Sequence, residues 1–465
     1  MMRSLFSGVS GLKGHQTRMD VIGNNIANVN ATGFKSSRVT FADTLSQTQT
    51  AASAPGATLG GTNPKQIGLG TGVASIDLLF TDGSAQQTGK NTDVALSGNG
   101  LFVVKSGNDT YYTRDGAFEF DADGNYVLPG SGHYVQGWMA KDGVLTTNGG
   151  VENIVVKAGK SMAAKASEKI TYENNLNSAA LTIKAVNGTE TAGTSATAST
   201  TSPVTLTMSD GSTITQTSGT YTVGYSLPIT TTVNVYDTLG NVHTLNLFFT
   251  KTEVNSTSGN KWTLSLDSDI TKTTKTITEE DGSTTTLTLN PVTINFTTAG
   301  KYNSGTGTTT LTLTNGALGT QSIAIDLSTL TQYAGNNTVK GSGDGNAAGT
   351  LKSVSIDQSG IITGVYTNGV RQSEAQIAIA QFSNASGLTK TGSSLYQESN
   401  NSGTANVKTA ADLGVTITPS ALEMSNVDIA NEFSDMIITQ RGFQSNSKVI
   451  TVGDEMLETL INMKR

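Results

Sequence analysis

The residues that could carry metal or nucleophilic chemistry are few and lie far apart in the sequence. The 465-residue chain has three histidines, His15, His133 and His243, and each stands in a separate context. None of them has a second ligand type at the spacing that a metal ion requires, so we expect each to be structural. The chain has no cysteine, which removes thiolate catalysis, disulfides and cysteine-based metal sites. We therefore expect no metal and no cofactor.

Three short motifs resemble ligand-binding loops but fail on spacing. The stretch 121–125 begins like a calcium loop, but the later acidic ligand of an EF-hand is absent and strand patterns flank it. A hairpin turn is the favoured interpretation. The stretch 159–161 ends like a phosphate-binding loop, yet Ile154 stands where that loop needs its first glycine. The glycine-rich stretch 68–72 lacks the spacing and the following helix of a dinucleotide fingerprint.

No set of catalytic roles can be assembled from the sequence. The chain lacks a Gly-x-Ser-x-Gly motif that would present a nucleophilic serine. Carboxylates are numerous, so a glycosidase pair stays open, because any two could meet in space. No pattern singles out such a pair. We predict that the protein is not an enzyme.

The composition favours short strands and many turns. Apolar residues make up 35% of the chain, charged residues only 14%, and there are 52 glycines. The formal net charge of −7 is mild for this length and predicts no nucleic-acid partner. No apolar run is long enough to span a membrane, and residues 1–14 lack the apolar core of a cleaved signal peptide. We expect no membrane insertion, and export, if it occurs, by a route that reads no cleaved signal.

Amphipathic helices are predicted at both ends of the chain. A helix over 429–463 would be about 50 Å long, which is longer than a small domain needs for its own core, and one over 4–28 would be about 35 Å long. Apolar residues recur every seven positions in both, which indicates helices that require partner helices. A basic amphipathic helix could also bind a membrane surface, but no aromatic cluster anchors this one. The predicted assembly interface comprises Leu5, Leu12, Met19, Ile26 and Val29 in the first helix and Ile429, Phe433, Met436, Phe443, Ile450, Leu457 and Ile461 in the second.

The second stripe of the C-terminal repeat is mixed. Gln440, Ser447 and Asp454 occupy positions that a tight two-stranded coiled coil would keep apolar. The pattern therefore argues against a tight two-stranded coiled coil, because buried Gln, Ser and Asp side chains would weaken it.

Between the helices, alternating apolar residues and turn signals predict two antiparallel β domains, one nested in the other. The fold class is therefore mainly β with α-helical termini, which form a coiled-coil-like inner domain. The stretch 187–220 has the weakest alternation and is open to interpretation as a flexible surface loop. The predicted domains are 1–30 with 424–465 (helical), 31–72 (extended linker or loop), 73–160 with 346–423 (split β domain) and 161–345 (inserted outer β domain).

Motifs at both ends of the chain resemble one protein family. The stretch 25–35 is similar to the N-terminal signature of the bacterial flagellar rod and hook family, with Ala31 where that pattern usually has Thr or Ser. The stretches 425–428, 440–444 and 454–457 resemble the C-terminal signature of the same family. The N-terminal match rests on Asn25, Asn28, Asn30, Gly33, Phe34 and Lys35.

The middle of the chain separates the members of that family. The stretch 235–243, with Trp262 after it, is similar to the inserted outer domain of the hook members. The stretches 113–118 and 366–369 match the split inner domain, which the distal rod also has. Because shorter rod members lack the insertion, the resemblance implies a hook subunit. A distal rod subunit is the alternative, and a secreted β-rich adhesin or carbohydrate-active protein is a more remote one.

The resemblance implies a structural subunit that self-assembles into a flexible hollow tube. Such a tube acts as a universal joint that links the basal-body rod to the filament and transmits torque. The implied partners are copies of the chain, rod proteins, hook–filament junction proteins, the hook cap and the flagellar type III export apparatus. The implied location is extracellular. Hook proteins of the spirochaete branch carry a lysine–cysteine-derived crosslink, for which this chain lacks the cysteine.

Overall fold

The computed structural model describes residues 2–463 except 57–59, 256, 258, 279–281, 283, 307–309 and 316–318. Contacts divide the chain into two compact units. The inner unit comprises Met1–Lys160, Leu351–Tyr366 and Arg371–Arg465, and the outer unit comprises Ser161–Thr350 and Thr367–Val370. Within the described residues, no helix is long and apolar enough to cross a membrane.

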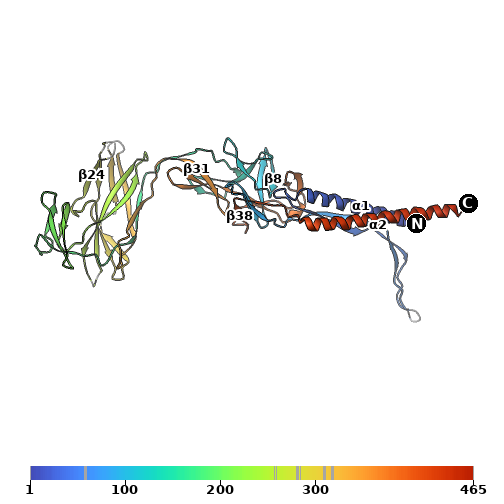
Figure 1. Cartoon of the computed structure of the whole chain (residues 1–465), viewed down its shortest axis with the longest axis horizontal. Helices are drawn as coiled ribbons and strands as arrows, with labels where there is room; N and C mark the ends of the chain where they lie inside the picture. Colours follow the sequence, from blue (N-terminus) through green and yellow to red (C-terminus); the bar gives the residue numbers. More distant parts are fainter. Residues whose placement is uncertain are drawn as a thin grey trace. The chain divides into compact units, whose positions relative to one another are not determined.

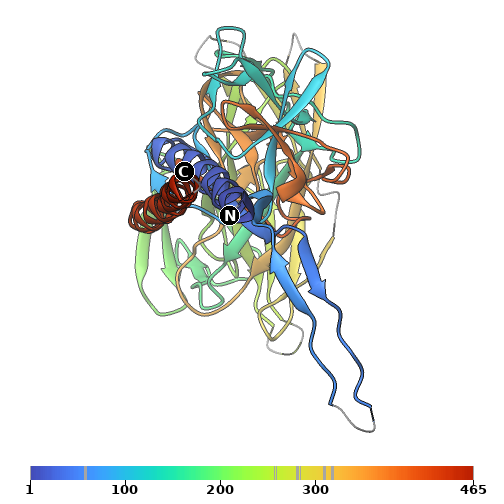
Figure 2. The ribbon, with the colours of Figure 1, turned by 90° about the vertical axis from the view of Figure 1, so that its right-hand side faces the viewer.

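The inner unit contains the two α-helices of the described residues, α1 (Met2–Ala27) and α2 (Ile429–Asn462). They run side by side (Figures 1 and 2). Asp428 caps α2 by accepting hydrogen bonds from the backbone N–H groups of Ala430, at 2.9 Å, and Asn431, at 3.4 Å. This side chain satisfies donors that a helix start leaves unpaired. The prediction of a mainly β chain with helical ends is confirmed.

Two antiparallel strand pairs follow α1. β1 (Ser37–Asp43) pairs with β4 (Thr71–Leu78), and β2 (Ser46–Thr50) pairs with β3 (Lys65–Gly68). Figure 2 shows the second pair extending away from the rest of the inner unit. The segment 31–72, expected to be an extended linker or loop, therefore contains paired strands. Every residue of β2 and β3 is exposed, so backbone hydrogen bonds pair them without the apolar alternation that marks a half-buried strand.

The β part of the inner unit combines strands that precede the outer unit in the sequence with strands that follow it. β7 pairs with β34, and β11 pairs with β33, over a core that includes Phe102, Phe118 and Ile377. The strands of this network in the inner unit are β7 (Leu101–Ser106), β8 (Asp109–Thr113), β9 (Glu119–Phe120), β10 (Tyr126–Leu128), β11 (His133–Lys141), β12 (Val144–Leu145), β13 (Glu152–Asn153), β31 (Gly349–Ile356), β32 (Ile361–Tyr366), β33 (Arg371–Ile377), β34 (Ile379–Gln381), β35 (Thr389–Gly392), β36 (Leu395–Gln397) and β37 (Asn406–Lys408). β14 (Ser161–Met162) belongs to the outer unit.

Two further strand pairs join residues 85–97, which lead into this β part, to residues 416–423, which precede α2. They bring the residues that follow β4 next to those that precede α2. The pairs are β5 (Ala85–Gln87) with β39 (Ala421–Glu423), and β6 (Val94–Ser97) with β38 (Thr416–Pro419). The 3-10 turn η1 (Ala385–Gly387) lies between β34 and β35.

The outer unit is built on two sheets of five and six strands that share a core containing Trp262, Phe249 and Leu313. The hairpin expected on both sides of residues 237–241 is present as β21 and β22. The five-stranded sheet comprises β21 (Ile229–Tyr236), β22 (Val242–Glu253), β23 (Lys261–Ser265), β26 (Val292–Phe296) and β27 (Tyr302–Thr306); the six-stranded sheet comprises β24 (Thr274–Thr278), β25 (Thr284–Thr288), β28 (Thr310–Asn315), β29 (Gly319–Thr331), β15 (Lys169–Asn175) and β30 (Lys340–Gly343).

A lobe of the outer unit has a small core of its own. Ile183, Leu206, Met208 and Tyr221 are buried together in it. The interpretation of 187–220 as a flexible surface loop is therefore wrong. Its strands are only four or five residues long, and the many Thr and Ser residues between them hide the alternation. The lobe comprises β16 (Ile183–Val186), β17 (Ser195–Ala198), β18 (Val204–Met208), β19 (Thr213–Gln216) and β20 (Gly219–Thr222).

Candidate assembly interface at the paired termini

The two helices approach each other through glycines. A Cβ atom on Gly8 would lie 3.3 Å from the Cγ1 atom of Ile450, and one on Gly453 would lie 2.8 Å from the Cδ2 atom of Leu5. Neither glycine leaves room for a larger side chain unless its neighbour moves. The absence of side chains at these points allows the helices to approach closely. The sequence analysis did not identify these glycines, although glycine in a helix interior is a usable signal because it weakens the helix.

Polar contacts hold the two helices together between the C-terminal part of α1 and the first turns of α2. The guanidinium group of Arg18 lies 2.9 Å from a carboxylate oxygen of Asp435. The amide of Asn25 donates to the carboxylate of Glu432 at 3.0 Å, and burial raises the pKa of Glu432. These contacts set the register of α1 against α2. Since Arg18 and Asp435 are partly exposed, we assign them orientation rather than large stabilisation.

The predicted interface residues do not all face one way. The residues chosen from α1 and the turn after it are half-buried, whereas those chosen from α2 divide between the α1 contact and solvent. A seven-residue repeat drifts by about 20° per heptad around a straight α-helix, so a long helix turns its stripe away from one partner. Half-buried are Leu5, Leu12, Met19, Ile26, Val29, Met436, Ile450 and Leu457; exposed are Ile429, Phe433, Phe443 and Ile461.

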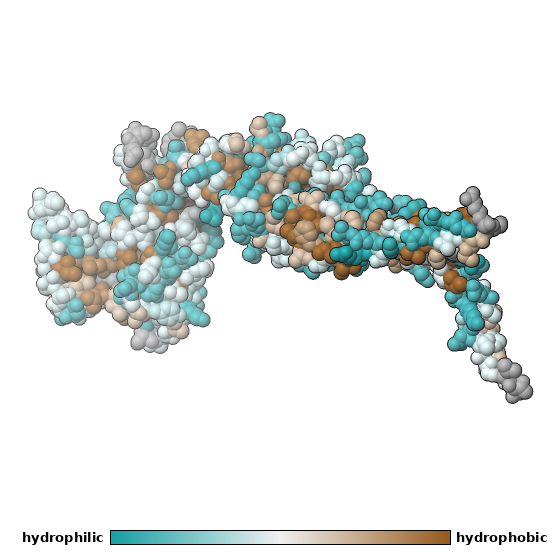
Figure 3. Space-filling view, turned by 45° about the vertical axis from the view of Figure 1, so that its right-hand side comes forward, coloured by the Kyte–Doolittle hydropathy of each residue, from teal (hydrophilic) through white to brown (hydrophobic). Residues whose placement is uncertain are grey.

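Further large apolar residues of α2 are exposed although the helix is already paired. Ile437 and Ile438 are 57% and 61% exposed, and the sequence analysis did not select them. Figure 3 shows apolar side chains between polar ones along the helical part of the inner unit. Such a set on one long helix marks an interaction surface. We call it the α2 apolar surface, and it comprises Ile429, Phe433, Ile437, Ile438, Phe443, Val449, Val452, Met456, Leu460 and Ile461, with Met463 directly after the helix.

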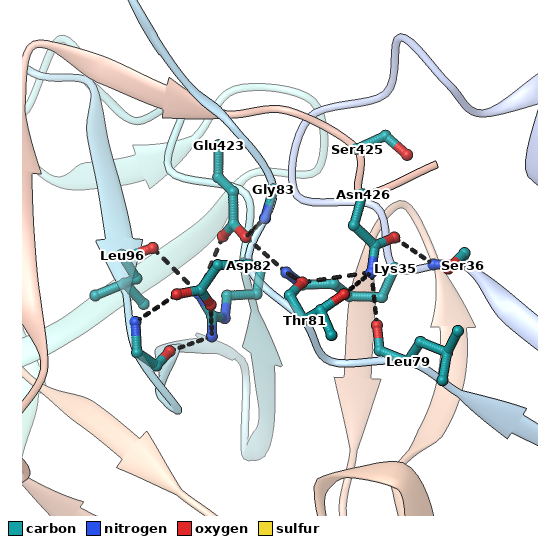
Figure 4. Close-up of polar contacts among 12 residues, drawn as sticks. Lys35, Ser36, Leu79, Thr81, Asp82, Gly83, Leu96, Glu423, Ser425 and Asn426 are labelled. Atoms are coloured by element: carbon teal, nitrogen blue, oxygen red, sulfur yellow. Dashed lines mark hydrogen bonds and ion pairs between the residues drawn. The ribbon is translucent and has the colours of Figure 1, made fainter. Parts of the chain in front are cut away.

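A buried ionic cluster lies beside the start of α2 (Figure 4). The Nζ atom of Lys35 lies 2.6 Å from a carboxylate oxygen of Glu423, and both side chains are at most 1% exposed. Arg114, also 1% exposed, lies 3.1 Å from the other oxygen of Glu423 and 3.3 Å from Asp82. Two cations therefore face two carboxylates. Buried charges persist when they are paired and hydrogen-bonded in this way.

Each member of the cluster has additional hydrogen bonds. Lys35 donates to the carbonyl oxygen of Thr81 at 2.7 Å, and Glu423 accepts from the backbone N–H of Gly83 at 2.9 Å. Arg114 donates to the carbonyl oxygen of Leu96 at 3.2 Å and also to that of Gly98. Burial lowers the pKa of Lys35, and the nearby Glu423 carboxylate opposes that effect. Because its buried ammonium group donates to both Thr81 and Glu423, we assign Lys35 a structural role.

The N-terminal family motif owes its residue types to this packing. Gly33 has a φ of 62°, and a Cβ there would lie 2.5 Å from the carbonyl carbon of Arg114. Phe34 is buried, with the Nζ atom of Lys390 4.0 Å from its ring centre. Asn25 bonds both backbone groups of Ser37, at 2.9 and 3.0 Å. Only a glycine allows this close passage of the chain past Arg114.

The remaining asparagines of the motif have smaller roles. Asn28 donates to the carbonyl oxygen of Asn24 at 2.9 Å, where α1 ends. Asn30 is exposed. On the C-terminal side, Asn426 accepts from the backbone N–H of Ser36 at 2.8 Å and donates to the carbonyl oxygen of Leu79 at 2.8 Å. The motifs of the two chain ends thus meet at one place. The sequence analysis missed Glu423, Arg114 and Asp82 as its centre.

The other candidate ligand residues have structural surroundings. His133 meets the ring of Tyr111 edge-on, with ring centres 5.1 Å apart. The buried His243 lies 3.5 Å from Asp237. Asp121 closes the turn between β9 and β10 by accepting from backbone groups at 2.8 and 2.9 Å. Across the described residues, no group of three or more His, Cys, Asp or Glu could hold a metal ion.

Comparisons with known proteins agree with this arrangement. Family profiles match in chain order: "Flagella basal body rod protein" over residues 5–35, "Flagellar hook protein FlgE/F/G D1 domain" over 95–185, "Flagellar basal body protein FlaE D2 domain" over 226–346 and "Flagellar basal body rod FlgEFG protein C-terminal" over 418–463. The first and last of these profiles cover most of α1 and α2, and the other two lie on the β units.

Full-length relatives are known. The flagellar hook proteins FlgE of Treponema pallidum and Borreliella burgdorferi are each 38% identical, with all of this chain and all of the relative covered. The basal-body rod protein FlgG of Bacillus subtilis is 29% identical, again over the whole of both chains. The fold and these matches define an axial subunit of the bacterial flagellum. The chain belongs to the flagellar hook protein family, and it is a structural subunit of the hook.

Proposed function

We propose that copies of this subunit polymerise through their paired terminal helices into a hollow, flexible tube. The observation that carries this proposal is the α2 apolar surface, which stays exposed even though α1 already occupies one side of α2. Isolated apolar surface of this kind is stabilised when helices of further copies cover it. The helices then form an inner layer, and the tube acts as a universal joint that transmits torque from the basal-body rod to the filament.

The β units serve a different purpose in this proposal. The exposed strand positions of the outer unit are rich in Thr and carry few charges, as in β25, where Thr284, Thr286 and Thr288 are exposed. Contacts made through such polar surfaces are weaker and more mobile than apolar ones. Bending requires these outer contacts to change while the helices keep the tube closed. The domains assigned to these roles are 1–30 with 424–465 for closure, and 73–160 with 346–423 plus 161–345 for the outer contacts.

The remaining parts of the proposal concern partners and location. The subunit meets rod proteins at one end of the tube and hook–filament junction proteins at the other, with the hook cap present during growth. It leaves the cell through the flagellar export apparatus without a cleaved signal peptide. It has no catalytic role in this proposal. Support for these statements is the family to which the chain belongs.

The test removes the helices and keeps the ionic cluster. A chain that spans residues 31–424 retains Lys35, Arg114 and Glu423, so its β units keep the contacts that close the inner unit. We expect this trimmed chain to be a folded monomer under conditions in which the full chain forms tubes visible by electron microscopy. Tubes formed by the trimmed chain would refute the role of the helices.

A further inference from the structure

The outer unit contains a cavity of about 250 Å³ between its lobe and the chain next to β22 and β23. Nine of its thirteen lining residues carry a hydroxyl group, which is the property that distinguishes it. The one charged lining residue is Asp269, and the lining contains no Lys or Arg. The cavity therefore does not suit an anion. Its donors and acceptors suit a neutral molecule with several hydroxyl groups.

Several of these hydroxyl groups have no hydrogen-bond partner among the residues that the structure describes. Thr250 is 2% exposed, and its buried Oγ1 atom forms no hydrogen bond within the part of the chain that the structure describes. The hydroxyls of Ser195, Thr222 and Tyr225 likewise have no partner among the described residues, while that of Tyr221 donates to Ser218. Buried polar groups are usually paired, so the unpaired hydroxyl of Thr250 in the cavity wall indicates a missing partner. Ser195 is exposed and Thr222 and Tyr225 are half-buried, so their hydroxyls are free to bind a ligand in place of water.

Besides hydroxyl groups, the wall contains two further features of sugar-binding sites, aromatic rings and a carboxylate that can accept hydrogen bonds. Tyr221 and Tyr225 provide aromatic faces, and Tyr221 is held in place because it is 9% exposed and anchored through its hydroxyl. One oxygen of Asp269 accepts from the backbone N–H of Thr271 at 3.0 Å and from its hydroxyl at 2.6 Å. The second oxygen of that carboxylate remains available to accept a ligand hydroxyl.

We propose that this cavity binds one neutral sugar ring. Its volume of about 250 Å³ lies below the roughly 300–1,000 Å³ of cavities that hold drug-sized ligands, so it fits a single ring rather than an oligosaccharide. The ring's hydroxyls pair with Thr250, Ser195 and Asp269, and its carbon face lies on tyrosine. None of its residues belongs to α1 or α2, so the proposed helix contacts between subunits do not cover it.

The test uses the full-length subunit and three neutral probes: glucose, galactose and N-acetylglucosamine. Saturation-transfer NMR and calorimetric titration measure binding, with glucuronate as the anionic comparison. We expect saturable binding of at least one neutral sugar and none of glucuronate. Ser195→Trp fills the cavity and is expected to abolish binding. Thr215→Trp places the same side chain on another exposed strand position of the lobe and leaves binding unchanged.

A second, smaller substitution keeps the proposal testable if Ser195→Trp fails to fold. Thr250→Val keeps the shape of the wall and removes the unpaired hydroxyl, and we expect it to weaken binding roughly two- to tenfold. The absence of saturable binding for all three neutral sugars would overturn the proposal. Equal binding by the parent, Ser195→Trp and Thr250→Val proteins would also overturn it.

Discussion

The imidazole ring of His15 lies directly against Gly442. A Cβ atom at position 442 would come within 2.7 Å of the Cε1 atom of His15 and 2.8 Å of its Nε2 atom. Thr439, one turn earlier on α2, is fully buried. Gly442, in the middle of the C-terminal motif 440–444, therefore has to lack a side chain so that α1 can pack closely against α2.

A large side chain at position 442 should separate the helices. We expect Gly442→Leu to lose about 1–3 kcal/mol of helix pairing, because the new side chain overpacks the contact with His15. Hydrogen–deuterium exchange of the α1 amides in the monomer measures this as lost protection. Gly23→Leu is the matched control, since nothing lies within 4 Å of a Cβ there. Equal protection in both variants would show that the glycine contact does not hold the pair together.

Replacing one carboxylate of the ionic cluster by an uncharged amide should greatly reduce the free energy of unfolding. Glu423→Gln leaves Lys35 and Arg114 buried with Asp82 as the only remaining carboxylate. Breaking a buried ion pair from one side costs about 3–5 kcal/mol, and we expect a loss of that size in the free energy of unfolding of the inner unit. Denaturant unfolding followed by the fluorescence of Trp138, which is buried in this unit, measures the change in a Trp262→Phe background.

Charge balance provides the control for that experiment. The double substitution Lys35→Met with Glu423→Gln leaves Arg114 paired with Asp82, so it should be more stable than Glu423→Gln alone. Asp77→Asn removes one partner of an exposed pair with Arg38 and should change the free energy of unfolding by no more than about 1 kcal/mol. If Glu423→Gln behaves like Asp77→Asn, the cluster contributes no more than a surface pair.

Secondary-structure elements could be predicted from the sequence more completely than the tertiary contacts between them. The helices at both ends, the hairpin at 237–241 and several strands of both units follow from local periodicity, whereas β2, β3 and the strands of the lobe do not. Lys35 was recognised only as part of a motif, because its partner Glu423 is 388 positions away and nothing local marks the pair. The glycines of the helix pair were missed because periodicity scores apolar side chains, whereas Gly453 contributes by having none.

The outer unit should lose stability in acid. Hydrogen bonds from Lys169 and Ser328 hold the pKa of Asp326 below its usual value. A lowered carboxyl pKa stabilises the fold at pH values above the unfolded pKa, about 3.9, and this contribution disappears as the pH falls through the lower folded value. Trp262 fluorescence in a Trp138→Phe background reports this unit alone. Asp326→Asn should lower stability at pH 7 and flatten its dependence on pH below about 4, and an unchanged slope would exclude this carboxylate.

Two apolar residues of α2 separate pairing within one subunit from contact between subunits. Ile450 is half-buried against Gly8 of α1, whereas Phe443 is 38% exposed. We expect Ile450→Asp to reduce protection of α1 in the monomer and to block tube formation. Phe443→Asp should leave the monomer unchanged and block tube formation alone, because it places a charge on the α2 apolar surface. Neither change should unfold the β units.

Gln440→Asp is the control for both variants, since it adds the same charge at an exposed polar position of the same helix. If Gln440 faces an aqueous channel, this variant still forms tubes. Sedimentation and electron microscopy of the three variants under polymerising conditions measure the outcome, with circular dichroism to verify the β units. Normal tubes from Phe443→Asp would remove that residue from the interface between subunits. Loss of tubes from Gln440→Asp would place Gln440 in that interface, since the charge there would then be buried between copies.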